Sequence, residues 1–233
     1  MPKKIMKGYF IVIDGTDGTG KATQTRLLVS QLKKQGYKVK TIDFPQYYTN
    51  FFGKVVGDCL AGKYGDFAKL DPHIASIIYA ADRFESKEKI ESWLAAGYVV
   101  VADRYMSSNQ IHQAGKILDI KKRKEFLKWL DEMEYKIFKI PKPNLIIYLD
   151  VPLEYSRKLI NAKANRIDKK YLDGKKDAHE SDDNHLLNAR RSARKMVKET
   201  NNWVQINCVK DRGLMSIEDI GEIVLDEVKK LLV

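Results

Sequence analysis

Glycines and one lysine at fixed spacing are the residues in this sequence most plainly suited to chemistry. Residues 15–21 read GTDGTGK, which satisfies the pattern GxxxxGK between an apolar run and an amphipathic stretch. Glycines at 15, 18 and 20 let successive backbone N–H groups turn inward, and the N-terminus of the following helix adds partial positive charge. We therefore predict that nucleotide phosphates are bound by Gly15, Thr16, Asp17, Gly18, Thr19, Gly20, Lys21, Ala22 and Thr23.

Lys21 is the first candidate for a catalytic role. Its ammonium group would bridge the β- and γ-oxygens of ATP and follow the charge that moves to the leaving oxygen. The next residue, Ala22, lacks the hydroxyl that ligates Mg²⁺ in most loops of this kind. Either phosphates, water and a distant carboxylate hold the metal, or the protein binds nucleotide without efficient turnover. A chance glycine turn is the bland alternative, and the strand-and-helix context disfavours it.

The pattern of apolar runs predicts an α/β fold. Five short runs bounded by turn residues are typical of buried strands, at 9–13, 39–44, 98–102, 145–149 and 203–206. Amphipathic stretches lie between them, at 25–32, 74–94, 121–138, 185–200 and 217–232. We predict a single domain over residues 1–233, with a five-stranded parallel sheet between two helix layers, the three-layer P-loop NTPase fold. The polar segment 163–183 is predicted to be a mobile lid.

A charged pair, Asp103 and Arg104, directly follows the apolar run at 98–102. A carboxylate at the end of a buried strand beside the phosphate loop can hold Mg²⁺ or its water shell, and so supply what Ala22 lacks. The neighbouring guanidinium can then clamp phosphates during transfer. For an isolated pair a surface salt bridge would be the better interpretation, but the nearby phosphate loop favours the functional one.

The composition limits the class of protein. The chain has 233 residues, 44% of them hydrophobic, and a formal net charge of +11. The positive charge is spread over helix faces and the lysine-rich segment, which favours small polyanions such as nucleotides over nucleic acid. The two distant cysteines, Cys59 and Cys208, indicate neither a disulfide framework nor a zinc site, and no stretch approaches the roughly 20 apolar residues of a membrane span. We expect a cytoplasmic protein that binds neither nucleic acid nor membranes.

Five motifs, taken together, resemble the thymidylate kinase family in order and separation. They are IDGTDGTGKATQT, DFPQYYTNFFG, YAADRFE, ADRYMSSNQIHQ and PKPNLIIYLDVP, and they cover nearly the whole chain. The resemblance implies a P-loop nucleoside monophosphate kinase that uses ATP and Mg²⁺ to convert dTMP into dTDP, and that forms a homodimer. Because the acceptor is already an anionic oxygen, positioning and charge stabilisation suffice and no strong general base is required.

The same resemblance assigns residues to the acceptor nucleotide. Asp17 would hydrogen-bond the 3′-hydroxyl of dTMP, Tyr79 would stack on thymine, and Arg83 would bind a carbonyl oxygen of the base. Arg104 would hold phosphate. The ordinary alternatives are a turn-stabilising aspartate, a core tyrosine and a surface arginine. The remaining residues expected to line the acceptor site are Phe44, Ser108, His112 and Gln113, although an isolated histidine is more often a packing residue.

Two departures from the family pattern shift the expected roles. No arginine follows Phe44-Pro45, where the family often grips the acceptor phosphate, so Arg104 and Lys54 would carry more of that binding. Gly18 stands where some members place a catalytic arginine, so the lid would have to supply one. That arginine would neutralise charge on the γ-phosphoryl group and help exclude water as the lid closes. The candidates are Arg166 and Arg157.

Other functions stay open. A deoxynucleoside kinase would share much of this fold but needs a carboxylate base for a neutral 5′-hydroxyl, and Asp14 or Asp43 could serve. Another pyrimidine monophosphate acceptor, dUMP, would require almost the same sequence. A non-catalytic nucleotide-binding regulator would explain Ala22 and the missing arginine, whereas a nucleic-acid-binding protein rests on the net charge alone.

Overall fold

The computed structural model describes residues 8–164 and 183–232. Its centre is one parallel sheet in the order β2-β3-β1-β4-β5, and each predicted strand end lies within one residue of the observed one. The predicted five-stranded α/β fold is therefore confirmed. The strands are β1 (Tyr9–Asp14), β2 (Val39–Asp43), β3 (Val99–Asp103), β4 (Leu145–Asp150) and β5 (Trp203–Asn207).

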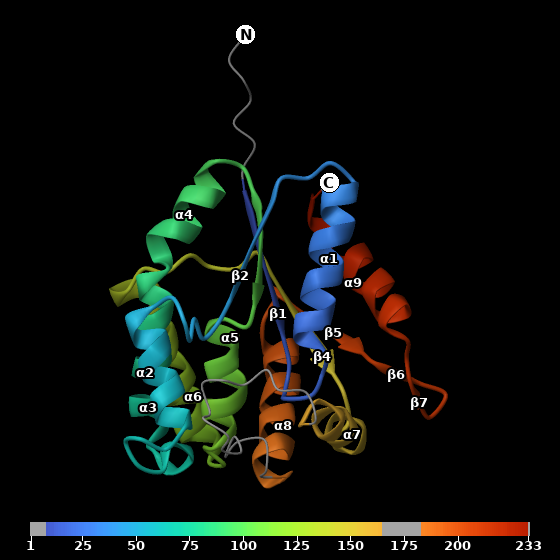
Figure 1. The fold of residues 1–233 in the computed structure, drawn as a ribbon. Helices are drawn as coiled ribbons and strands as arrows, with labels where there is room; N and C mark the ends of the chain where they lie inside the picture. Colours follow the sequence, from blue (N-terminus) through green and yellow to red (C-terminus); the bar gives the residue numbers. More distant parts are fainter. Residues whose placement is uncertain (1–7, 165–182, 233) are drawn as a thin grey trace.

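Helices cover both faces of the sheet (Figure 1). One face packs against α1 (Lys21–Lys34) and α9 (Ile217–Leu232). The other packs against α3 (Pro72–Glu85), α4 (Lys87–Ala95), α6 (Ile120–Asp131) and α8 (Asp183–Glu199). In β1, Ile11 and Ile13 belong to the first of these cores, whereas Phe10 and Val12 belong to the second. Burial on both faces explains why the central strands β1, β3 and β4 are continuously apolar up to their last residue, whereas the edge strands β2 and β5 contain polar residues.

The amphipathic stretch at 74–94 is two helices rather than one. Ser86 separates α3 from α4, with φ −91° and ψ −1°. Its hydroxyl oxygen accepts a hydrogen bond from Nδ2 of Asn50 at 3.0 Å, which joins the break to a segment far away in the sequence. The turn lets Ile90 of α4 reach the core, where it is fully buried.

Shorter elements connect the layers. The helix α2 (Phe51–Leu60) and the turn η1 (Phe67–Lys69) precede α3, and η3 (Glu132–Ile137) prolongs α6. After β3 come α5 (Met106–Ser108) and the π-helical η2 (Asn109–Gln113), and after β4 comes α7 (Leu153–Ala164). A hairpin of β6 (Val209–Lys210) and β7 (Gly213–Leu214) precedes α9. None of the described helices is both long and apolar enough to cross a membrane.

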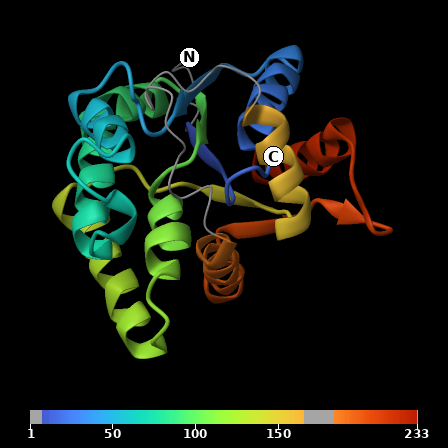
Figure 2. The same ribbon diagram turned by 60° about the horizontal axis from the view of Figure 1, so that its bottom comes forward.

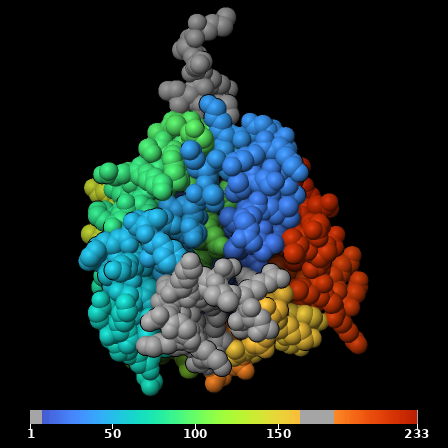
Figure 3. Space-filling model, viewed as in Figure 1, coloured from blue at the N-terminus to red at the C-terminus, as the bar shows by residue number. Residues whose placement is uncertain are grey.

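The carboxyl ends of all five strands meet at one edge of the sheet, which Figure 2 brings forward. In parallel α/β sheets this edge is where ligands bind. In the space-filling view, a hollow beside the blue surface of α1 opens onto green atoms from the middle of the sequence (Figure 3). The predicted lid at 163–183 lies outside the described residues except for residues 163, 164 and 183, and Arg166 lies outside them as well.

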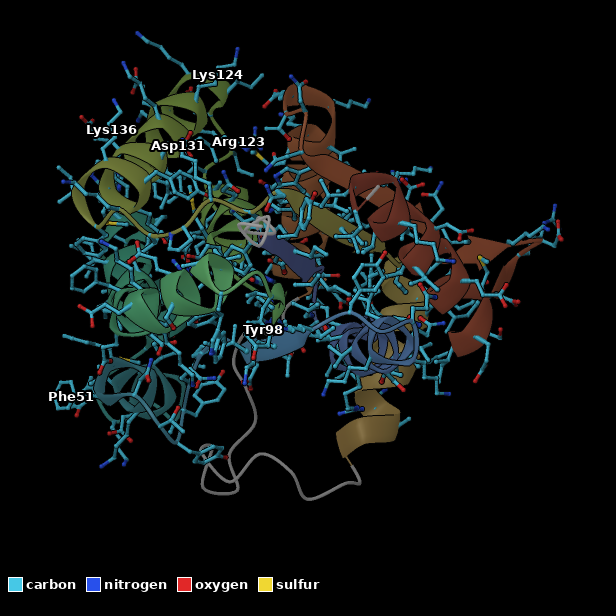
Figure 4. All side chains as sticks on the ribbon, turned by 90° about the horizontal axis from the view of Figure 1, so that it is seen from above. Phe51, Tyr98, Arg123, Lys124, Asp131 and Lys136 are labelled. Carbon is cyan, nitrogen blue, oxygen red and sulfur yellow. The ribbon has the colours of Figure 1, made fainter. Side chains whose placement is uncertain are left out.

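Exposed lysines gather on the outer side of the helical layer that contains α6. Figure 4 shows Lys124 and Lys136 directed away from the sheet, and both are exposed. Arg123, in contrast, is buried and donates to Oγ of Ser192 in α8 at 3.1 Å. Lys124 and Lys136 therefore place positive charge on a solvated helix face.

Candidate active site at the carboxyl edge of the sheet

The phosphate loop joins β1 to α1. Gly18 and Gly20 have φ of +77° and +84°, a left-handed conformation that glycine adopts without steric cost. Gly20 is also the residue before α1, and among the described side chains none caps that helix. The first N–H groups of α1 therefore stay available for a phosphate, and the helix dipole favours its negative charge.

Lys21, in the first turn of α1, points back into this loop. Its Nζ donates to the carbonyl oxygen of Thr16 at 2.7 Å, and the side chain is only 8% exposed. Burial, helped by the positive charge of Arg104, lowers the pKa of Lys21 to about 8, although neighbouring carboxylates oppose the shift. An approaching phosphate would stabilise the ammonium form, so the site is electrostatically prepared for an anion.

Asp14, the last residue of β1, ties the loop to the segment after β3. Its buried carboxylate accepts hydrogen bonds from the Gly15 N–H at 2.8 Å, from Ser107 Oγ at 2.5 Å and from Ser108 Oγ at 2.9 Å. Both oxygens are thus occupied by donors within the protein. This arrangement suits a structural anchor and argues against Asp14 as the general base of a deoxynucleoside kinase.

Arg104 faces the loop from the end of β3. Its backbone has φ +68°, and its N–H donates to the carbonyl oxygen of Ile13 at 3.0 Å. The guanidinium donates to Oδ1 of Asp17, lies 3.4 Å from Ser108 Oγ and lies 3.2 Å from His112 Nε2. Burial alone would lower the pKa of Arg104, but the surrounding carboxylates outweigh it and raise the pKa. Arg104 is therefore a permanent cation at the loop.

Asp103 ends β3 and pairs in register with Ile13 of β1. Burial raises the pKa of its carboxyl group, while Lys21 and Arg104 oppose that shift. Within the described residues, no three metal-binding side chains lie close enough to form a cage. Mg²⁺ often takes one or two carboxylates and completes its shell with phosphate oxygens and water, so a site with Asp103 as a protein ligand fits this ion.

Arg83 and Tyr79 lie on α3, further from the phosphate loop. Arg83 is buried and donates from Nε and NH2 to the two carboxylate oxygens of Glu134, at 2.7 and 2.6 Å. Nδ2 of Asn109 reaches the same carboxylate at 3.3 Å. Tyr79 is half-buried, with its ring centre 5.7 Å from that of Phe67. The arginine is thus held rigidly rather than solvated.

The other predicted side chains lie in different surroundings. Phe44 is buried against Tyr105, with ring centres 5.6 Å apart. Gln113 is buried, and its Oε1 accepts no hydrogen bond from the described residues. Lys54 is exposed on α2, and Arg157 of α7 donates from Nε to Oδ1 of Asp183 at 2.5 Å.

A family model described as thymidylate kinase matches residues 13–214 of this chain. The chain belongs to the thymidylate kinase family. It is 37% identical over 160 residues to a probable thymidylate kinase of Thermococcus onnurineus, covering 66% of this chain and 72% of the relative. It is 29% identical over 157 residues to the thymidylate kinase of Mycobacterium tuberculosis, covering 67% and 72% of the two chains. With the thymidylate kinase of Plasmodium falciparum the identity is 31% over 151 residues, covering 65% of each.

Three of the predicted site residues lie together in the structure, and two further residues contact predicted ones. The structure brings Asp17, Lys21 and Arg104 together. It also adds Glu134, the partner of Arg83, and His185, which contacts His112. One signal marked the first of these: Glu134 continues the helical spacing of the buried residues 126 and 130, where an apolar residue is expected.

Proposed function

We propose that the protein transfers the γ-phosphoryl group of ATP to dTMP, giving dTDP and ADP. The observation that carries the proposal is the convergence of three charged groups at one strand edge. Lys21 follows the phosphate loop in the sequence, and Arg104 follows β3. Asp17 accepts a hydrogen bond from Arg104, and its Oδ1 lies 4.0 Å from Nζ of Lys21. Two cations and one anion at a phosphate loop suit the binding and transfer of a phosphoryl group.

The chemistry follows from what these groups can do. The N–H groups at the start of α1 would hold the ATP phosphates, and Lys21 would follow the charge towards the leaving oxygen. Arg104 keeps its charge throughout and would hold the acceptor phosphate in line. Asp103 would hold Mg²⁺ together with phosphate oxygens and water, and the bound ion would neutralise part of the phosphate charge. A lid arginine, Arg166 or otherwise Arg157, would complete the site.

The acceptor nucleotide is proposed to lie between the loop and α3. Asp17 would accept a hydrogen bond from its 3′-hydroxyl, while Ser108 and His112 would line the same side. Tyr79 would stack on the thymine ring, and Arg83, held in place by Glu134, would donate to a carbonyl oxygen of the base. A side chain whose donors are fixed in advance loses little freedom on binding and so favours one base over another. Phe44 and Gln113 would also line the acceptor site.

An assay of ADP release tests the proposal. The protein is given ATP and Mg²⁺ with dTMP, dUMP, dCMP, dGMP, AMP or thymidine, and a reaction without acceptor reports any ATP hydrolysis. We expect turnover to be highest with dTMP and to fall at least about 100-fold in Lys21→Ala. Lys33→Ala, an exposed lysine of the same helix, is the control.

Other outcomes select the alternatives. Turnover with thymidine alone would show that the protein is a deoxynucleoside kinase. A preference for dUMP would show that dUMP, rather than dTMP, is the acceptor. ATP binding without transfer to any acceptor would contradict the proposal and favour a nucleotide-binding regulator.

A homodimer in the cytoplasm is part of the same proposal. On one face of α3, Ile74, Ile77 and Phe84 are 49%, 41% and 49% exposed, an apolar stripe suited to association. Cys59 and Cys208 are free and buried, as expected in a reducing compartment. Light scattering after gel filtration tests the association, with Ile77→Glu expected to yield the monomer. A monomeric wild-type protein at micromolar concentration would contradict it.

A further inference from the structure

Two histidines, His112 and His185, form a chain of contacts that ends at Arg104. His112 lies in η2, and His185 lies in the first turn of α8, which packs along η2 (Figure 2). Nε2 of His112 is 3.2 Å from NH1 of Arg104, and Nδ1 of His112 is 3.2 Å from Nε2 of His185. The chain therefore runs from α8 to the guanidinium that binds Asp17.

The protons along this chain can be arranged in only one way. A guanidinium has donors and no acceptor, so Nε2 of His112 must be the acceptor in its contact with Arg104. The neutral ring of His112 then carries its proton on Nδ1 and donates it to Nε2 of His185. His185 must in turn be unprotonated at Nε2. Arg104 thus fixes the tautomer of His112 and requires an acceptor at His185.

The surroundings favour the neutral form of His112. Burial lowers its pKa well below the ordinary value, and the positive charges of Arg104 and Lys21 act in the same direction as His185. Asp17 opposes them. The charged groups that face this ring thus come from the phosphate loop, from α1, from the end of β3 and from α8. A proton on Nε2 of either ring would set two N–H groups against each other and break the chain.

We propose that His185 is a positioning residue that holds the Arg104 guanidinium against Asp17 through His112. The role rests on the proposed phosphoryl transfer, in which Arg104 binds the acceptor phosphate. An arginine side chain has several rotatable bonds, and the ordered guanidinium is useful only if it is not free to turn away. Asp17 contacts NH2 of the guanidinium and His112 contacts NH1, so both terminal nitrogens are held in place.

Two substitutions at position 185 separate this role from packing. In His185→Gln, the amide oxygen can still accept the Nδ1 proton of His112, whereas in His185→Leu no acceptor remains. We expect kcat with dTMP to fall about tenfold in His185→Leu, with KM for ATP unchanged, and to stay close to the wild-type value in His185→Gln. The control is His73→Gln at the start of α3, where the ring contacts Asp71 and Trp129.

The comparison of the two variants supplies a readout that packing alone would not move. Activity should follow the presence of a hydrogen-bond acceptor at position 185, which glutamine supplies and leucine does not. Equal kcat values in wild type and His185→Leu would overturn the proposal. Equal losses in the glutamine and leucine variants, with unchanged thermal unfolding, would overturn it as well.

A measurement without turnover separates this proposal from the proposed function. Nitrogen NMR of the nucleotide-free protein at neutral pH should show His112 protonated on Nδ1 only, and the Arg104 Nε–H signal should broaden in His185→Leu but not in His185→Gln. These results would support the positioning role even if no acceptor in the assay were phosphorylated. Protonation of His112 on Nε2 would overturn it whatever the activity.

Discussion

Arg83 and Glu134 form a bidentate ion pair that joins α3 to η3 inside the protein. The two N–O distances are 2.7 and 2.6 Å, and the side chains are 3% and 0% exposed. Burial alone would lower the pKa of Arg83, but the carboxylate of Glu134 outweighs it and raises that pKa. The burial of each charged group is therefore tolerated only because the opposite charge lies beside it.

Removal of one member of this pair should destabilise the protein strongly. Glu134→Ala leaves the Arg83 guanidinium buried without its carboxylate, which is expected to cost about 3–5 kcal/mol in the free energy of unfolding. The double variant Arg83→Met with Glu134→Leu should recover most of that loss, because no charge stays buried. Urea unfolding measures both. The exposed pair of Lys230 and Glu227 is the control, where Lys230→Ala should cost about 0–1 kcal/mol.

The features that could be predicted from the sequence are those set by local residue patterns and by the order of the strands. Asp17 and Lys21 follow β1 in the phosphate loop and at the start of α1, and Arg104 follows β3. Because β1 and β3 are parallel neighbours, the segments that follow them lie side by side. Glu134 is different, since it lies 51 residues beyond Arg83 and only the packing of η3 on α3 makes the pair. The break between α3 and α4 at Ser86 also involves a distant contact, the hydrogen bond from Asn50.

Lys21 should reduce the stability of the nucleotide-free protein. Because its pKa falls from 10.5 to about 8 on folding, the unfolded chain binds more protons between these pH values, and stability rises with pH across that window. Below pH 8 both states are protonated and the full cost is present. Lys21→Met should therefore raise the free energy of unfolding at pH 7 by up to about 3 kcal/mol, and the gain should shrink towards pH 10.5.

Urea unfolding at pH 7 and pH 10 without nucleotide checks this expectation, with Lys33→Met as the control on the exposed face of the same helix. A Lys21→Met protein that is less stable than wild type at pH 7 would show that its contact with the Thr16 carbonyl outweighs the cost of burial.

Gly18 should tolerate no side chain, because α7 lies directly against the phosphate loop. A Cβ atom there would be 2.5 Å from the carbonyl oxygen of Ser156 and 2.8 Å from Cγ1 of Ile160. Gly36 has a similar positive φ, but none of the described atoms lies within 4 Å of its Cβ position. Gly36→Ala should cost about 1–2 kcal/mol from the backbone alone, and Gly18→Ala about 1–3 kcal/mol more.

Thermal unfolding without nucleotide compares these two variants. Equal losses would mean that α7 moves aside at little cost. A larger loss of stability in Gly18→Ala would show that a side chain at position 18 collides with the backbone of α7. That collision would explain why this chain has glycine there rather than arginine.

Asp17 should contribute to acceptor binding through the 3′-hydroxyl. Its carboxylate lies beside Arg104 and 4.0 Å from Lys21, so Asp17→Ala removes a charged acceptor from the site. A charge-assisted hydrogen bond contributes about 1.5–3 kcal/mol, so KM for dTMP should rise about 10- to 100-fold, with little change in KM for ATP. The decisive comparison uses 3′-deoxy-dTMP, which wild-type protein should disfavour and Asp17→Ala should accept as well as dTMP. Asp66→Ala, which removes an exposed partner of Lys69, is the control. An unchanged preference for the 3′-hydroxyl in Asp17→Ala would instead assign its recognition to Ser108 or His112, which lie around the same guanidinium as Asp17.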